Sequence, residues 1–371
     1  MAHAFEVVAA DLDYIGGRLA DELPRLAGKQ ILITGGAGFL GYYLVQAALA
    51  WNRGVGAGEA IRVTVLDNFI RGVPAWLGRL RGDPSLLLLR ADVTAPLPAV
   101  AGEPEYVVHA ASIASPTYYR QHPLETMDAN VLGLRRLLDA GVERRERPLE
   151  GFLFFSSSEI YGDPPPDQIP TREEYRGNVS CTGPRACYDE SKRYGETLCV
   201  NFARRHGLPI RVARPFNNYG PGLSLNDRRV LPDFARDVLV GRDLVLLSDG
   251  SPTRTFCYVA DAVVGYYRVL LRGRAGEAYN IGTEAPEISV LELAERVAAL
   301  GRELFGYGGQ VVRRASEERE YLVDNPVRRC PCITKARTEL GYEPGISLDE
   351  GLRRSLLWYA TAADSAQETG D

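Results

Sequence analysis

The chain has 371 residues, of which 45% are hydrophobic and 25% are charged, and its formal net charge is −5 at pH 7. This composition is that of a globular protein of one large unit or two coupled lobes, which excludes extensive disorder. The negative charge argues against binding along nucleic acid, and no uncharged apolar run is long enough to span a membrane. The N-terminus lacks an apolar signal core and six cysteines make no disulfide framework, so we expect a cytoplasmic protein with reduced thiols.

Short apolar runs alternate with helical patterns along the first 214 residues. The runs are typical of buried parallel strands; they lie at residues 30–34, 61–66, 86–90, 106–109, 152–155 and 210–213. Helical patterns occupy residues 39–51, 123–138 and 188–206. The alternation predicts an α/β fold, with a Rossmann-type doubly wound parallel sheet covered by helices on both faces.

The chain divides into four predicted segments. Apolar residues at helical spacing mark the first segment. A cluster of Gly, Pro and Asn at residues 215–226 marks the start of the third segment. Helical patterns follow it at 230–240, 259–271, 289–304 and 347–360. The segments are an N-terminal helical extension at 1–28, a dinucleotide-binding domain at 29–214 with a returning segment near 255–282, a smaller α/β substrate-binding lobe mainly at 215–362, and a flexible tail at 363–371.

A glycine-rich loop joins the first strand to the first helix of the sheet. Gly35, Gly38 and Gly41 permit a tight turn. Phe39 and Leu40, which lie between the last two of these glycines, begin the helix. In this strand–turn–helix context the loop lets the backbone approach a pyrophosphate, while the helix N-terminus offers free N–H groups and a positive dipole end. The sequence therefore predicts a dinucleotide site.

Polar residues that follow the second and third strands indicate which dinucleotide binds. Asp67 ends the second strand, 26 residues after Gly41. A carboxylate there accepts hydrogen bonds from the adenosine ribose and repels a 2′-phosphate, which favours NAD over NADP. Arg71 nearby could instead hold a phosphate. We also expect Asn68, Asp92 and Val93 at the adenosine end of the site.

Candidate catalytic residues come from one helix and from one strand end. Tyr188 and Lys192 lie four residues apart, on one face of a helix. A neighbouring ammonium and an oxidised nicotinamide would favour the phenolate and make Tyr188 a usable base. Ser157, Ser158 and Glu159 directly follow the strand at 152–155, and the carboxyl ends of parallel strands line the ligand crevice.

These motifs together resemble the extended short-chain dehydrogenase/reductase family, in its branch that modifies nucleotide sugars. The motifs are TGGAGFLG at 34–41, the serine cluster, and YDESK at 188–192, and the resemblance covers about residues 29–362. It implies that Gly35, Gly38 and Gly41 form the dinucleotide loop and that Ser157, Tyr188 and Lys192 carry the catalysis. The implied cofactor is NAD.

Three segments, at 110–119, 177–193 and 226–234, look most like the UDP-glucuronate decarboxylases of this family. The resemblance implies a nucleotide-sugar substrate, UDP-glucuronate, and a homodimer formed through a four-helix bundle. It also implies a set of substrate-binding residues. They are Ser115, Tyr119, Arg185, Asn217, Val230, Arg254 for the diphosphate, and Arg329 for the sugar carboxylate.

The implied reaction is oxidation at C4 of the sugar, loss of CO2 and reduction. Tyr188 would take the proton of the C4 hydroxyl, and Ser157 would help to stabilise the C4 oxyanion. Glu159 has two open interpretations. In the first, Glu159 takes part in the chemistry: its negative charge favours the departure of CO2, or its pKa is raised enough for it to act as an acid. In the second, Glu159 is structural, as a helix cap or a member of an ion pair.

Three departures from the family pattern leave the identity of the sugar open. Cys332 stands where Asp is usual, and Gly222 stands where the decarboxylases have Arg. The basic cluster that usually follows the second strand is reduced to little more than Arg71. The first alternative is therefore a 4-epimerase that acts on a uronic acid or a heptose. The second is a 4,6-dehydratase, which is less favoured because Ser158 stands where several dehydratases have Asp. A non-catalytic NAD-binding regulator is the alternative from another class. Cys330 and Cys332 lack further ligands at suitable spacing, so no metal is expected.

Overall fold

A computed structural model describes residues 2–144, 146–314 and 323–367. Within these ranges, a central sheet has seven parallel strands in the order β11-β6-β5-β4-β1-β2-β3. The strands are β1 (Gln30–Thr34), β2 (Arg62–Asp67), β3 (Leu86–Arg90), β4 (Tyr106–His109), β5 (Gly151–Phe155), β6 (Ile210–Pro215) and β11 (Ala278–Ile281). The predicted doubly wound parallel sheet is confirmed.

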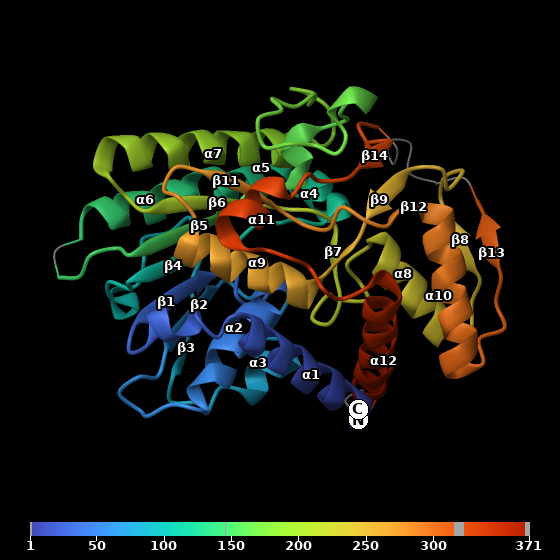
Figure 1. Cartoon of the computed structure of the whole chain (residues 1–371), viewed down its shortest axis with the longest axis horizontal. Coiled ribbons are helices and arrows are strands. Elements are labelled where there is room, and N and C mark those ends of the chain that lie inside the picture. The colour runs from blue at the N-terminus through green and yellow to red at the C-terminus, as the bar shows by residue number, and fades with distance from the viewer. Residues whose placement is uncertain (1, 145, 315–322, 368–371) are drawn as a thin grey trace.

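Two helical layers cover the sheet, because successive strand side chains point to opposite faces. In β5, Leu153 and Phe155 pack into one hydrophobic cluster, whereas Phe152 and Phe154 pack into the other. The first cluster includes residues of α2 (Phe39–Asn52) and α9 (Val259–Arg272), and the second includes residues of α6 (Leu134–Val142) and α7 (Ala186–His206). Figure 1 shows these helices on opposite sides of the sheet.

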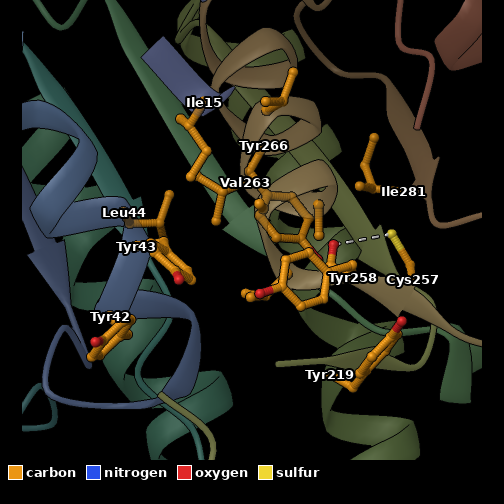
Figure 2. Packing of buried hydrophobic residues seen from close by; sticks show 14 of the residues in the cluster. Ile15, Tyr42, Tyr43, Leu44, Tyr219, Cys257, Tyr258, Val263, Tyr266 and Ile281 are labelled. Carbon is orange, nitrogen blue, oxygen red and sulfur yellow. Dashed lines mark hydrogen bonds between the residues drawn. The ribbon is translucent and has the colours of Figure 1, made fainter. Parts of the chain in front are cut away.

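The N-terminal extension forms α1 (Ala2–Arg18), which packs against α2, α9 and α12 (Leu348–Gln367). Ile15 of α1 lies fully buried beside Tyr43 of α2 and Val263 of α9 (Figure 2). Asp11 is also fully buried, and its carboxylate accepts hydrogen bonds from Tyr258 at 2.6 Å and Arg354 at 2.7 Å. These contacts tie the first helix of the chain to the last one.

The second half of the chain adds short sheets and helices beside the central sheet (Figure 1). The short sheets have the orders β12-β9-β14, β13-β8 and β10-β7. The remaining elements are β7 (Asn218–Tyr219), β8 (Leu244–Leu246), β9 (Thr253–Thr255), β10 (Cys257–Tyr258), β12 (Glu287–Ser289), β13 (Val311–Arg313), β14 (Arg328–Arg329), α8 (Val230–Leu239), α10 (Val290–Phe305) and α11 (Thr334–Leu340). None of the helices in the described ranges is both long and apolar enough to cross a membrane.

Two expected elements differ from the structure. The helix expected at 123–138 is divided into α5 (Pro123–Asp128), a π-helical turn (Ala129–Gly133) and α6. The turn contains Asn130, whose amide bonds Ser191 of α7 at 2.9 Å, and Gly133, where a Cβ would come within 2.5 Å of Val93. The tail expected to be flexible from residue 363 is helical to Gln367 in α12, and residues 368–371 lie outside the described ranges.

Short helices that the sequence did not predict lie between the strands: α3 (Ala75–Arg79) follows β2, and α4 (Pro116–Gln121) follows β4. Both begin near a proline, which is favoured in a first helical turn. Their brevity hides the 3.6-residue periodicity on which the helix predictions depend.

Candidate active site

The order of strands in the sheet reverses at β1 and β4, whose carboxyl ends open the crevice where ligands of such folds bind. The loops after β1, β2, β4 and β5 all leave the sheet at this edge. They carry the glycine loop, Asp67, Ser115 and the serine cluster. The structure thus brings the expected cofactor and catalytic segments to one edge.

The glycine loop turns tightly because two of its positions leave no room for a side chain. Gly35 has φ +68°, and a Cβ there would lie 2.5 Å from Ala111 Cα. A Cβ on Gly41 would lie 2.1 Å from the carbonyl oxygen of Gly36. Gly38 is the N-cap of α2, and no side chain caps that helix. The empty cap leaves the N–H groups of the first turn for a pyrophosphate, so the loop fits a dinucleotide.

Asp67 connects the end of β2 to the glycine loop. Its carboxylate accepts hydrogen bonds from the N–H of Ala37 at 3.1 Å and of Phe69 at 2.8 Å. Burial raises the pKa of Asp67, and these backbone bonds oppose that shift. A carboxylate has further lone pairs for a ribose hydroxyl. Arg71, the candidate for a 2′-phosphate, is already paired with Asp227 at 3.3 Å.

The remaining predicted cofactor residues lie in two environments. Asn68 donates a hydrogen bond to Asp92 at 3.2 Å, and the Thr94 hydroxyl lowers the pKa of Asp92 by a further hydrogen bond. Val93 instead turns its side chain into the core beside Gly133. Phe39 and Leu40 are partly buried and pack against the core through the first turn of α2.

Tyr188 lies near the start of α7, with its side chain buried against Tyr119. The two rings are stacked, with centroids 5.0 Å apart and an interplanar angle of 12°. Burial raises the pKa of Tyr188 to about 12, although a hydrogen bond with Ser157 lowers it. The expected lowered pKa is therefore absent in the chain by itself, because desolvation of the phenolate outweighs its polar contacts.

Lys192 lies one turn further along α7 and is fully buried. Its ammonium donates a hydrogen bond to the carbonyl of Phe155 at 2.8 Å and lies 5.6 Å from the centroid of the Tyr188 ring. Burial lowers the pKa of Lys192 to about 7. The predicted pair thus shares one helix face, but the ammonium contacts the end of β5 rather than the phenol oxygen.

Glu159 is held between two arginines. Its carboxylate forms ion pairs with Arg185 of α7 and with Arg329 of β14, the latter through both guanidinium nitrogens, one at 2.6 Å. Burial alone would raise the pKa of Glu159, but the two guanidinium groups outweigh it and hold the pKa well below its usual range. In the chain without substrate, the structure shows the ion pairs of the second interpretation. A raised pKa of Glu159 beside a substrate carboxylate stays a prediction.

Asp189 is a buried carboxyl that the sequence analysis missed. Burial, together with the charge of Glu159, raises the pKa of Asp189 to about 8. Its Oδ2 lies 3.8 Å from Nε of Arg185, one helical turn earlier. The available signal was this i, i+4 spacing directly beside Tyr188. A neutral Asp189 leaves the guanidinium groups of this cluster in excess of the ionised carboxylates.

Arg254 of β9 is buried without an anionic partner. It donates hydrogen bonds to backbone carbonyls of Thr253 at 2.7 Å, Val327 at 3.1 Å and Pro326. Among the residues that the structure describes, no carboxylate lies within ion-pair distance of it. Burial and the charge of Arg329 lower the pKa of Arg254 to about 9. A buried cation of this kind fits an anionic ligand group.

Two of the other predicted substrate residues bond to the backbone of other segments. The Ser115 hydroxyl donates to the carbonyl of Asp227 at 2.6 Å, and the amide of Asn217 donates to the carbonyl of Thr255 at 2.8 Å. Val230 begins α8, directly after the loop that carries Asp227. Ser158 is buried at the start of the short helical turn that presents Glu159.

Steric crowding explains why residue 222 is glycine and not the arginine expected from the family pattern. Its φ is +91°, in the left-handed region that favours glycine, and a Cβ would lie 2.5 Å from Cβ of Tyr42. An arginine therefore does not fit this backbone. Cys332 is buried, and its thiol donates a hydrogen bond to the hydroxyl of Thr334 at 3.3 Å.

Comparisons with known proteins agree with this geometry. Residues 31–282 match the NAD dependent epimerase/dehydratase family. A relative named UDP-glucuronic acid decarboxylase 6, from Arabidopsis thaliana, is 39% identical over 323 residues, which cover 87% of this chain and 86% of the relative.

Two solved structures share the fold. A UDP-glucose 4-epimerase from Thermotoga maritima, with UDP-glucose, has a TM-score of 0.76 at 27% identity, covering 90% of this chain and 99% of its own. A dTDP-glucose 4,6-dehydratase from Streptomyces venezuelae, with NAD bound, has a TM-score of 0.75 at 27% identity, covering 91% and 98%. By the length of the family match and the identity to its relatives, this chain belongs to the NAD dependent epimerase/dehydratase family.

Proposed function

We propose that the chain is an NAD-dependent decarboxylase of UDP-glucuronate that forms UDP-xylose. The observation that carries this choice of sugar is a cluster of three buried arginines: Arg185 and Arg329 pair with Glu159, and Arg254 lies close enough for their charges to shift its pKa. Asp189, with a pKa of about 8, adds little negative charge at neutral pH. The excess positive charge suits a substrate with both a diphosphate and a carboxylate. The identity to relatives named UDP-glucuronic acid decarboxylase supports the same choice.

The proposed chemistry assigns the transfer of the C4 proton to Tyr188 and the stabilisation of the C4 oxyanion to Tyr188 and Ser157. When bound, NAD would take a hydride from C4 of the sugar and return it at the end. Tyr188 removes the proton of the C4 hydroxyl, with Ser157 bonded to its phenol. The C5–C6 bond of the keto acid then breaks, its electron pair passes to the C4 oxygen, and CO2 leaves. Tyr188 and Ser157 stabilise this oxyanion until C5 gains a proton.

The product mass tests the proposal directly. Incubation of the NAD-loaded protein with UDP-glucuronate is expected to give a nucleotide sugar that is lighter by one CO2, as measured by mass spectrometry. A product lighter by one water would indicate a dehydratase. A product of unchanged mass with altered stereochemistry would indicate an epimerase, the alternative that the departures at Gly222 and Cys332 keep open. No turnover on any nucleotide sugar would favour a non-catalytic NAD-binding protein.

We also propose that the protein forms a homodimer through α5 and α7, which pack side by side. Apolar side chains are exposed on α5, on the π-helical turn and on α7: Leu124 is 69% exposed, Leu132 51% and Tyr194 51%. Exposed apolar side chains on neighbouring helices are typical of an interface. Leu124→Glu is expected to shift the protein from dimer to monomer in analytical ultracentrifugation. Val240→Glu, which places the same charge at an exposed site after α8, should remain dimeric; a monomeric parent protein would contradict the proposal.

All six cysteines are free thiols in the structure, and five of them are at least partly buried. Free thiols are typical of proteins kept in a reducing compartment. This supports the cytoplasm as the place where the proposed enzyme works.

A further inference from the structure

A set of contacts joins three loops at the mouth of the crevice. Arg71 comes from the loop after β2, Ser115 and Tyr118 come from the segment after β4, and Asp227 and Arg229 come from the loop before α8. We call these five residues the Asp227 clasp. Asp227 lies 156 residues from Arg71 and 112 from Ser115, so the clasp is a tertiary feature that connects the two halves of the chain.

Asp227 is the centre of the clasp. Its side chain is 8% exposed, and its carboxylate pairs with Arg71 at 3.3 Å and with Arg229 at 3.0 Å. The Ser115 hydroxyl donates to the Asp227 carbonyl at 2.6 Å. The guanidinium of Arg71 also lies 4.6 Å from the centroid of the Tyr118 ring, a cation–π contact.

Two further hydrogen bonds hold the loop before α8 against the segment after β4. The Tyr118 hydroxyl donates to the carbonyl of Asn226 at 3.1 Å, and the Arg229 guanidinium donates to the carbonyl of Ala114 at 3.1 Å. Arg228 between them has φ +63°, an uncommon backbone for a residue with a side chain. Such a conformation persists where its surroundings fix it, which indicates that this loop has one defined position.

The clasp connects the loops on either side of the glycine loop, next to the predicted adenosine end of the cofactor site. Arg71 follows Asp67, the predicted ribose contact, by four residues. Ser115 follows β4, which borders the reversal of strand order, so the loops of Arg71 and Ser115 stand on either side of the glycine loop. Arg229 lies close enough to Tyr188 for its charge to lower the pKa of that phenol. The loop before α8 therefore bridges the two loops that flank the glycine loop.

We propose that Asp227 is a positioning residue that retains the coenzyme, because its bonds to Arg71 and Arg229 hold the crevice closed over bound NAD. The chemistry of the family makes retention useful. A hydride taken from the substrate has to be returned to the same substrate. If the coenzyme left in its reduced form, the keto intermediate would have no hydride donor. The clasp also occupies Arg71, a cation four residues after Asp67, so it removes one partner for the 2′-phosphate of NADP.

Release of the coenzyme without substrate tests the proposal. The protein is saturated with NAD, free NAD is removed by rapid gel filtration, and the NAD that remains bound is measured over time. Asp227→Asn, which keeps the shape but removes the charge, is expected to release NAD about tenfold faster than the parent protein. Asp139→Asn is the matched control, since it breaks the exposed ion pair of Asp139 with Arg135 on α6.

Arg71→Ala gives a second route to the same question. Arg71 is 53% exposed at its side chain, so its loss leaves the core intact even if Asp227→Asn fails to fold. It should release NAD faster than the parent protein, and the double variant should be no faster than Asp227→Asn, because Asp227→Asn already removes the ion pair with Arg71 as well as the one with Arg229. Salt should speed release from the parent protein more than from Asp227→Asn.

Release at the parental rate from Arg71→Ala would overturn the proposal, and so would additive effects in the double variant. Because no sugar is present, the outcome is independent of the proposed substrate. A protein that retains NAD through the clasp but fails to decarboxylate UDP-glucuronate would contradict only the proposed function.

Discussion

Tyr188→Phe is expected to lower kcat by about 10²–10⁴-fold while leaving NAD binding unchanged. The substitution removes only the phenol oxygen, and the ring that stacks on Tyr119 stays in place. Because burial raises the pKa of Tyr188 to about 12 in the chain without coenzyme, little phenolate is present at neutral pH. Loss of the proton has to be favoured in the ternary complex, so kcat/KM of the parent enzyme should rise with pH until that step is complete.

The matched control is Tyr194→Phe, which removes a phenol oxygen from an exposed position on the same helix. Turnover of UDP-glucuronate and the amount of NAD bound should be measured for both variants. Near-normal turnover by Tyr188→Phe would show that another group removes the C4 proton. A loss of NAD from Tyr188→Phe would instead indicate that the hydroxyl holds the coenzyme.

The fold was predictable because its signals are local. The runs at 30–34 and 152–155 are short and apolar with a glycine or serine after them, and such runs become buried parallel strands whatever their distant neighbours are. The glycine loop was predictable for the same reason, since Gly35 and Gly41 stand where any Cβ would overlap nearby backbone. The break within the helix at 123–138 depends on Val93 and Ser191, which only the tertiary structure brings to it.

The electrostatics of the site could not be predicted from the sequence. The sign of the pKa shift of Glu159 depends on Arg185, 26 residues away, and on Arg329, 170 residues away. Burial acts in the opposite direction, toward the raised pKa that the acid interpretation of Glu159 supposes. The pairing of Asp227 with Arg71 is equally remote, and nothing in either segment alone points to the other.

Glu159→Gln is expected to affect both stability and chemistry, because the carboxylate neutralises two buried guanidinium groups. Removing one member of a buried ion pair typically costs about 3–5 kcal/mol of unfolding free energy, since the remaining charges lack compensation. Asp189 offsets part of this cost. The charge of Glu159 helps to raise the pKa of Asp189, so its removal lets Asp189 ionise beside Arg185.

The chemical effect can be separated from the structural one by a control of equal burial. Glu196 pairs with Arg214 through both carboxylate oxygens, at 2.6 and 2.8 Å, and the two side chains are 14% and 10% exposed. Glu196→Gln should therefore lose a similar unfolding free energy in urea titrations. Its turnover, measured well below the unfolding transition, should stay near that of the parent enzyme.

Glu159→Gln measured under the same conditions should decarboxylate at least about a hundredfold more slowly. In this variant the guanidinium groups of Arg185 and Arg329 bind the substrate carboxylate without competition from Glu159, which stabilises the charge that has to leave as CO2. Oxidation at C4 does not use Glu159, so reduced nicotinamide should accumulate in single-turnover absorbance traces. If both variants lose stability equally and both decarboxylate at the parental rate, Glu159 only supports the fold.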